Sequence, residues 1–322
     1  MKCIFRLRMK RRNKFKWAIC RAPAYLPPMK QFVTLVVALL AGLSLVGQAQ
    51  SSDDNHPKFP SPYDSAHFSW RKPVPRNRLR PLRPDRPGTT ESPFTVDAGH
   101  FQLETDLGRL INEPGSEEDP QKRTWRAAYA IVKLGLSRKT DLQVELPFYA
   151  AQKERPVGTE DWDNSRGFGD VAVRIKHNFL GDDQDGPLAA SIIGFVRLPT
   201  GVSGVSNTRP EYGIVLPVNV ELGDTYNLEA QLETDLEYDP EGAQRYVRLM
   251  PSVALDRQFG KKLGLLMEGA FPWNSEQHRW HAQLNVAPTF NVTDNFQLDA
   301  GTHIALNGRT QREYFVGFTV RY

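Results

Sequence analysis

Cysteine is nearly absent from this sequence, which removes several classes of protein from consideration. Only Cys3 and Cys20 occur among 322 residues, and both lie in a basic N-terminal stretch that we expect to be removed on export. A mature chain without cysteine has no disulfide framework and no thiolate metal site. This composition fits an exported protein.

Acidic residues are missing from residues 1–49, which contain ten Lys and Arg. Met29 begins a pattern typical of a signal peptide: a lysine, an apolar run over 32–46, and the small-residue motif Gly-Gln-Ala at 47–49. The apolar run has 15 residues, which is short for a spanning helix. We expect residues 1–49 to be an N-terminal extension plus signal peptide, with Met29 the true start and a mature chain beginning near Gln50. The alternative is one long basic n-region.

The positive charge of the chain belongs to this export segment. The formal net charge is +4, and removing ten Lys and Arg with no acid leaves −6 for the mature chain. The apparent basicity therefore gives no support to nucleic-acid binding.

Apolar residues are scarce in residues 50–93, which contain nine prolines and a basic run over 71–86. Such a segment has little apolar surface to bury, so we expect a Pro/Arg-rich periplasmic linker that is extended or disordered. The alternatives are a plug that enters a barrel lumen and an arm that touches the anionic cell wall. The segment carries eight Lys and Arg against five acids, a net +3, which leaves −9 for residues 94–322.

Helical periodicity is missing from residues 94–322, where strict two-residue alternation takes its place. Polar and apolar residues alternate over Asp170–Phe179, and Arg174 and Lys176 lie mid-strand on the polar face. Such charges do not suit the core of a small soluble sandwich, whereas a water-filled barrel accommodates them. The same pattern predicts twelve strands, at 98–108, 126–136, 140–150, 168–180, 187–198, 211–222, 226–238, 246–256, 262–273, 279–290, 295–306 and 312–322.

Strand length and loop rhythm favour a membrane barrel over a soluble β-sandwich or propeller. The predicted strands have 11 to 13 residues, enough to cross a bilayer at a tilt. About 17 residues join the first predicted strand to the second, and only three join the second to the third. Long outer loops and short periplasmic turns alternate in this way in bacterial barrels. We therefore expect an all-β fold: a closed antiparallel transmembrane β-barrel of about twelve strands over residues 94–322. An even strand count returns both ends of the barrel to the periplasm.

Charged residues on the polar faces are the candidate site, because such charges are costly on the lipid face and are therefore expected to point inward. They could pair across the wall and hold the barrel's shape, or select ions during passage. Four acids within nine residues of strand 226–238 require bases or cations nearby. Acids outnumber bases, so we expect an acidic lumen that favours cations. The predicted pore-lining residues are Glu104, Asp106, Asp170, Arg174, Lys176, Arg197, Glu229, Glu233, Asp235, Glu237, Arg248, Glu268 and Asp299.

Catalytic patterns are missing as well. A lipid-hydrolysing barrel needs a serine and a histidine at strand ends, and the His-x-Ser at 67–69 lies in the expected linker. His278 and His281 could bind a metal at a loop edge, but loop histidines are more often solvated. We expect no enzyme activity, no metal and no cofactor.

Three pieces of the chain carry a family resemblance: Leu134–Pro147 (LGLSRKTDLQVELP), Gly167–Phe179 (GFGDVAVRIKHNF) and Val196–Gly201 (VRLPTG). Together they resemble the outer-membrane barrel family labelled "putative MetA-pathway of phenol degradation", whose members are often called transporters. The end of the chain, Glu313–Tyr322, also resembles the terminal signal read by the barrel-insertion machinery. This terminal stretch differs from the usual signal in two ways: it ends with Tyr instead of Phe, and it has Phe315 where a polar residue is typical.

The resemblance implies a location in the bacterial outer membrane and passage of small solutes, with aromatic or apolar compounds suggested by the family's label. The expected partners are outer-membrane lipid, the barrel-insertion machinery and a small-molecule solute, with no nucleic acid. The alternatives are a structural or adhesive outer-membrane barrel and, with less support, an outer-membrane lipid hydrolase.

Overall fold

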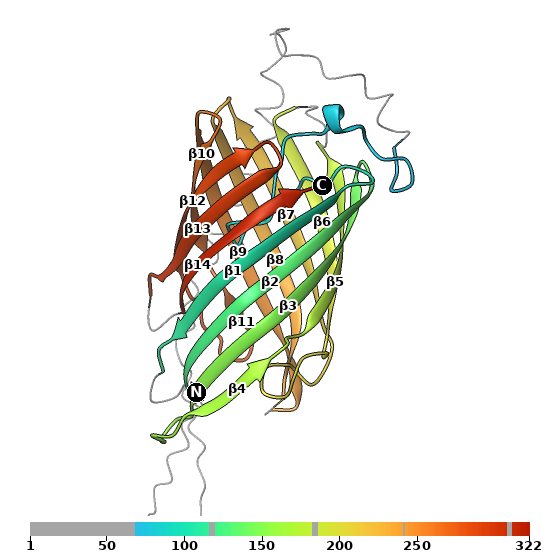
Figure 1. Cartoon of the computed structure of the whole chain (residues 1–322). Coiled ribbons are helices and arrows are strands. Elements are labelled where there is room, and N and C mark those ends of the chain that lie inside the picture. Colours follow the sequence, from blue (N-terminus) through green and yellow to red (C-terminus); the bar gives the residue numbers. More distant parts are fainter. Residues whose placement is uncertain (1–67, 116–119, 182–185, 241, 308–310) are drawn as a thin grey trace, which may run out of the picture. The chain divides into compact units, whose positions relative to one another are not determined.

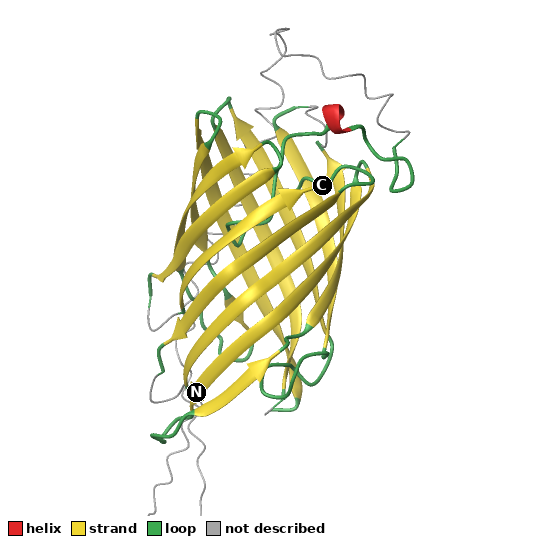
Figure 2. Cartoon of the chain, viewed as in Figure 1, coloured by secondary structure: helices red, strands yellow, loops and turns green. Residues whose placement is uncertain are grey.

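Twelve long strands form a closed antiparallel ring (Figures 1 and 2). The computed structural model describes residues 68–115, 120–181, 186–240, 242–307 and 311–322, all within the compact unit Pro60–Tyr322. The predicted extension, start site and signal peptide lie outside these residues. The ring consists of β1 (Phe101–Glu113), β2 (Gln121–Ser137), β3 (Thr140–Arg155), β5 (Val171–Leu180), β6 (Leu188–Leu198), β7 (Glu211–Leu222), β8 (Tyr226–Asp239), β9 (Gln244–Phe259), β10 (Leu263–Ala270), β12 (Gln283–Thr293), β13 (Phe296–Ala305) and β14 (Arg312–Arg321).

Two pairings close the ring. Strand β1 pairs with β14, and β9 pairs with β10, so each of the twelve strands has a neighbour on both sides. Two short strands lie off the ring: β4 (Asp163–Gly167) pairs with the end of β3, and β11 (Trp273–Asn274) pairs with β9. The predicted twelve-stranded closed barrel is therefore confirmed.

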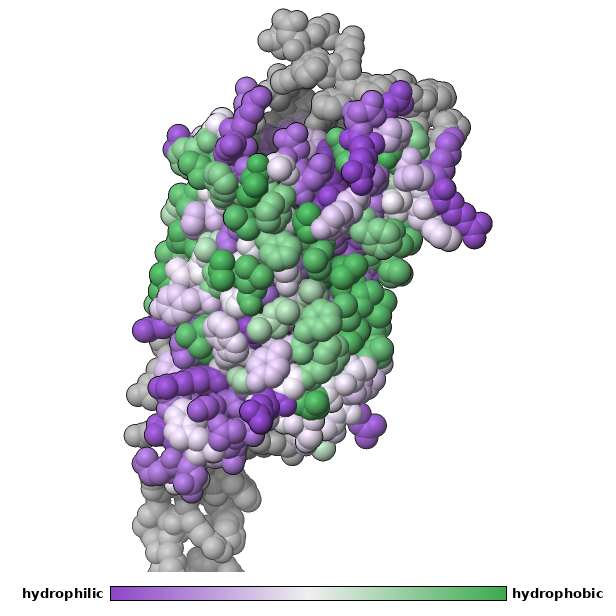
Figure 3. All heavy atoms as spheres, in the orientation of Figure 1, coloured by the Kyte–Doolittle hydropathy of each residue, from purple (hydrophilic) through white to green (hydrophobic). Residues whose placement is uncertain are grey.

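Polar side chains point into the barrel and apolar side chains point outward, which is the reverse of the arrangement in a soluble protein. In β5, Arg174 and Lys176 are buried with exposed fractions of 5% and 1%, whereas Ile175 and Phe179 are more than half exposed. Figure 3 shows apolar residues gathered on the outer wall and hydrophilic residues gathered toward both rims. An apolar outer surface of this extent is typical of a protein whose surroundings are lipid.

The two rims of the barrel differ. At one rim, called here the short-turn end, brief connections such as 138–139 and 260–262 join the strands, and Phe101 and Tyr322 exchange backbone hydrogen bonds. At the other rim, the long-loop end, the connections include 156–170 and 199–210. The first and last residues of the chain that forms the barrel thus lie at the short-turn end, as the even strand count requires.

Most strand boundaries agree with the sequence pattern, and β7 matches its predicted range. Strands β2 and β3 continue several residues further at the long-loop end than predicted, because they pair with each other as far as Gln121 and Arg155. The predicted strand 262–273 is wrong at its end, since β10 stops at Ala270 and Pro272 follows, which has no N–H to donate to a ladder.

The described chain contains one short helix, the 3-10 turn Arg76–Arg78. Among the helices of the described residues, none is long and apolar enough to cross a membrane.

Candidate functional site

The chain that precedes β1 enters the barrel from the short-turn end (Figure 1). Residues Arg80–Asp97, called here the luminal segment, hydrogen-bond to inward side chains of β1, β2, β3, β5, β8, β10, β13 and β14. The expectation of an extended or disordered periplasmic linker over 50–93 does not describe its last part, 80–93, which makes these hydrogen bonds with the wall. The alternative of a plug describes this part; residues 50–67 lie outside the described residues.

Arg86 fastens the middle of the luminal segment to the barrel wall. Its Nη1 donates to Asp106 Oδ1 at 2.5 Å, while Nη2 and Nε donate to Asp299 at 2.5 and 3.1 Å. Asp106 is also held by Arg109, at 2.6 Å. Because Asp106 lies on β1 and Asp299 on β13, one guanidinium joins the strands on either side of β14. The geometry is that of a strong, charge-assisted bidentate contact.

Asp85 forms a second attachment through two lysines of the wall. Lys133 Nζ lies 2.5 Å from one carboxylate oxygen and Lys176 Nζ lies 2.7 Å from the other. Burial alone would raise the pKa of this carboxyl, but the two lysines outweigh it and hold the pKa of Asp85 below its ordinary value. Glu104 completes the arrangement by accepting the backbone N–H groups of Asp85 and Arg86, each at 3.1 Å. The wall thus recognises both side chain and backbone of the segment.

Glu268 of β10 holds the turn of the luminal segment. Its carboxylate accepts the backbone N–H groups of Thr89 and Thr90 and the Thr90 hydroxyl, at 2.9, 2.5 and 2.5 Å. The Thr90 hydroxyl also lies 2.7 Å from that of Ser252 on β9. A carboxylate that accepts several N–H groups from one turn acts as a cap, so this turn is fixed rather than loosely packed.

Glu91 joins the segment to the opposite side of the lumen. It pairs with Arg174 of β5, which also donates to Glu145 of β3 at 2.6 Å. The backbone N–H of Glu91 donates to Gln231 of β8 at 2.7 Å. Burial raises the pKa of Glu91 from its ordinary value, and Arg174 opposes that rise.

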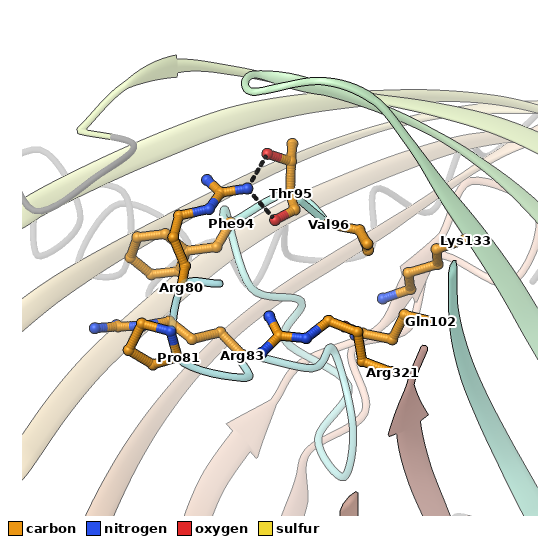
Figure 4. Close-up of a pocket in the computed structure, with 9 residues that line it drawn as sticks. All are labelled: Arg80, Pro81, Arg83, Phe94, Thr95, Val96, Gln102, Lys133 and Arg321. Atoms are coloured by element: carbon orange, nitrogen blue, oxygen red, sulfur yellow. Dashed lines mark hydrogen bonds between the residues drawn. The ribbon is translucent and has the colours of Figure 1, made fainter. Parts of the chain in front are cut away.

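A small cavity lies beside the base of the luminal segment (Figure 4). Nine residues line a cavity of about 30 Å³, which is room for about two water molecules. Arg80 donates to the Thr95 carbonyl at 2.9 Å, and Asp97 pairs with Arg80 and Arg321 at 2.6 and 3.1 Å. The cavity is lined by Arg80, Pro81, Arg83, Phe94, Thr95, Val96, Gln102, Lys133 and Arg321.

The acidic row of β8 is partly neutralised by its neighbour. Arg248 of β9 contacts Glu233, Asp235 and Glu237 at 3.1, 2.5 and 2.8 Å. Glu229, the remaining acid of the row, has no ion pair with a described residue. Three acids of this row thus share one base.

Asp170 differs from the other predicted site residues. It precedes β5, and its carboxylate accepts the N–H groups of Gly201 and Asn207 and the hydroxyl of Ser206, at 2.9, 2.8 and 2.5 Å. It therefore fastens a connection at the long-loop end rather than contacting the luminal segment. Arg197 lies near the same rim, where it pairs with Glu211 at 3.1 Å.

Sequence reasoning missed the residues of the luminal segment, above all Asp85, Arg86 and Glu91. It also missed Arg109, which joins Asp106 to Glu313 at 2.5 Å. One signal pointed here: Phe315 departs from the polar pattern expected in the last strand. Its ring is buried, and the guanidinium of Arg109 lies 4.6 Å from the ring centre.

The family described as "Putative MetA-pathway of phenol degradation" matches residues 84–322. The chain belongs to this family. The match begins inside the luminal segment, so most of that segment is part of the unit that the family shares. The recognition made from three short motifs is confirmed.

Solved structures with similar folds are outer-membrane barrels. The crystal structure of the COG4313 outer membrane channel from Pseudomonas putida F1 is 10% identical with a TM-score of 0.56, covering 73% of this chain and 99% of that chain. The KdgM porin is 10% identical with a TM-score of 0.41, covering 68% of this chain and 98% of that chain. At such identity the likeness to the first concerns the fold alone. No curated protein sequence matches the chain.

Proposed function

We propose that the protein is an outer-membrane channel for small solutes, and that its luminal segment controls passage. One observation carries the proposal: a ring of twelve strands with an apolar outer wall encloses an interior lined with acidic and basic side chains. A structural barrel could fill its interior with wall-to-wall contacts. Here the bases and acids of the wall are bound in large part by one stretch of chain, the luminal segment.

The contacts of the luminal segment are of the kind that can be exchanged for water. Arg86, Asp85 and Glu91 contact the wall through ion pairs and hydrogen bonds, and their partners on the wall are acidic and basic side chains. Departure of the segment would expose a polar lumen that water can fill, as in porins. Small solutes would then pass where the segment lies.

The charge of this lumen favours cations. The predicted pore-lining set contains nine acids and four bases. The luminal segment carries three arginines and three acids, so its net charge is zero and its presence does not reverse the sign. Cations concentrate in a narrow lumen of negative charge. The family's label suggests aromatic or apolar compounds as the transported solutes, and a charged lumen would admit those that carry a polar group.

A channel is favoured over an enzyme because the one His-x-Ser pattern of the sequence, at 67–69, precedes the barrel strands instead of lying at a strand end. Ser69 is half-buried in a turn in which its N–H donates to the Lys72 carbonyl at 3.0 Å. The rival proposals are therefore a structural or adhesive barrel and, with less support, a lipid hydrolase.

Location is tested by fractionation and by gel mobility. We expect the protein in the outer-membrane fraction, released by detergent, with an unboiled form that migrates differently from the boiled form, because closed barrels resist unfolding by detergent. Recovery in the soluble fraction alone would contradict the outer-membrane proposal.

Passage is tested by planar-bilayer recording of the refolded full chain and of two matched variants. Arg86→Gln removes the attachment to Asp106 and Asp299, so we expect a higher conductance than in the wild type. Arg76→Gln removes the same charge from an exposed turn outside the lumen and should leave the conductance unchanged. If neither the wild type nor Arg86→Gln conducts at any voltage, the structural barrel is the better proposal.

A further inference from the structure

Two arginines and two tyrosines form a cluster on the outside of the barrel at the long-loop end. The guanidinium of Arg245 on β9 lies 5.5 Å from the ring centre of Tyr212 and 5.9 Å from that of Tyr238. Arg209, in the loop before β7, lies 6.0 Å from the ring of Tyr238. These distances are within the range of cation–π contacts. The four residues are called here the outer arginine cluster.

The outer arginine cluster faces away from the lumen. Tyr238 and Arg245 are directly paired across β8 and β9, so their side chains share one face of the sheet. Two residues further into the wall along each strand, Leu236 and Val247 are exposed, as is Ile214 on β7. The guanidiniums therefore lie where the apolar outer wall ends, at the level of an interface between lipid and water.

Among the described residues, the acids nearest to this cluster along β7 and β8 are bound elsewhere. Glu237 and Glu211 lie on the same strands but point inward, where Arg248 and Arg197 bind them. Within the part of the chain that the structure describes, neither Arg209 nor Arg245 has a carboxylate partner. Stacking on tyrosine holds a guanidinium plane in place while its N–H edges stay available for an anion.

We propose that the outer arginine cluster binds the phosphate groups of a phosphorylated glycolipid, the lipopolysaccharide of the outer leaflet. Guanidinium forks match phosphate oxygens, and the acyl chains of the same molecule would lie along the apolar strip that begins at Leu236. This inference rests on the proposed outer-membrane location, because only there does the long-loop end meet that leaflet. It concerns the lipid contact of the wall and not the passage of solutes.

The experiment compares lipopolysaccharide retained by the full-length protein after mild detergent extraction from the outer membrane. Native mass spectrometry counts bound lipopolysaccharide on the wild type, on Arg209→Gln/Arg245→Gln, and on Arg257→Gln. Arg257 is the matched control: it lies on β9 at the short-turn end and stacks on Tyr226 and Phe259 at 5.1 and 4.6 Å. It therefore carries the same chemistry in the other leaflet.

We expect the double variant to retain about tenfold less lipopolysaccharide, since hydrogen bonds to charged groups each contribute enough to change affinity severalfold. Arg257→Gln should match the wild type, and enzymatic removal of the lipid phosphates should abolish the difference between wild type and double variant. Equal retention by wild type and double variant would overturn the inference. Conductance and membrane fractionation of the same samples separate this failure from failure of the proposed function. A protein that conducts and fractionates with the outer membrane but binds no lipopolysaccharide contradicts the inference about the cluster and leaves the proposed function standing.

Discussion

The guanidinium of Arg86 occupies the space in which Gly317 would carry a side chain. A Cβ built on Gly317 would lie 2.2 Å from Nη2 of Arg86 and 2.4 Å from the backbone oxygen of Thr105. Gly317 lies on β14, between the strands that carry Asp106 and Asp299. Glycine at this position lets the luminal segment lie directly against the wall, and this close approach gives Arg86 access to both carboxylates.

Substitution of Gly317 should weaken the attachment of the luminal segment. We expect Gly317→Ala to lower the free energy of unfolding by about 1–3 kcal/mol, as overpacking does, and to raise the conductance. Because Thr105 is also crowded, a double-mutant cycle with Arg86→Gln isolates the contribution of Arg86. The double variant should lose less stability than the two single variants together. Strict additivity would show that Arg86 has no part in the effect.

The control for this cycle is Gly194→Ala on β6. A Cβ at Gly194 meets no atom within 4 Å, so this substitution should leave both stability and conductance close to the wild type.

Arg248 should set the ion preference of the wall formed by β8 and β9. Arg248→Gln leaves Glu233, Asp235 and Glu237 without their shared base, so the cation-to-anion permeability ratio should rise, measured as the reversal potential in a salt gradient. We also expect a loss of stability of about 3 kcal/mol or less, since removing one partner of a buried pair is costly but Arg248 is partly solvated.

Arg245→Gln is the control for this prediction, because Arg245 lies three residues away on the same strand and faces outward. It removes the same charge from the protein without removing it from the lumen. An equal shift of reversal potential in both variants would mean that total charge, and not the lumen, determines selectivity.

The fold was predictable from the sequence because inward and outward positions alternate without interruption over most of the barrel. In β8, acids and amides alternate with Leu228, Leu232 and Leu236, and the predicted range 226–238 differs from the observed strand by one residue. Errors occurred where a proline or a hairpin extension decided the boundary. In β5 the phase also gave the inward side of the wall for Arg174 and Lys176.

The luminal segment was not predictable from composition. A proline-rich stretch with few apolar residues is expected to stay disordered because it cannot bury enough apolar surface. That rule assumes an apolar core. The interior here is polar, so Asp85, Arg86 and Glu91 are ordered by ion pairs and by backbone N–H groups bound to Glu104 and Glu268. The partners of Asp170 were also not predictable. Alternation gives the face of the sheet on which a residue lies, but not the loop to which its side chain hydrogen-bonds.

Asp85 makes the attachment of the luminal segment dependent on pH. Its pKa in the folded protein lies below the ordinary value of 3.8 because Lys133 and Lys176 outweigh burial. A carboxyl with a lowered pKa stabilises the fold above its ordinary pKa, and this contribution is lost as the pH falls through the folded value. We therefore expect the contribution of Asp85 to be constant from neutral pH to about 4 and to be lost in more acidic solution, where the conductance rises. Asp85→Asn should show the higher conductance already at neutral pH; identical pH profiles for both proteins would contradict this role.

A reversible lock between segment and wall gives the most direct test that the segment controls passage. The hydroxyls of Thr90, in the luminal segment, and Ser252, on β9, lie 2.7 Å apart, so Thr90→Cys/Ser252→Cys places two thiols at close range. The mature chain expected from the sequence has no other cysteine, which leaves no competing pairing. When oxidised, this variant should stay at low conductance even when Arg86→Gln is added, because the covalent bond replaces the lost attachment. Reduction in the bilayer chamber should then raise the conductance within the same recording. Single-cysteine variants are the control and should not respond to the reductant. If the oxidised variant conducts as well as the reduced one, solutes pass beside the luminal segment and not through the space that it occupies.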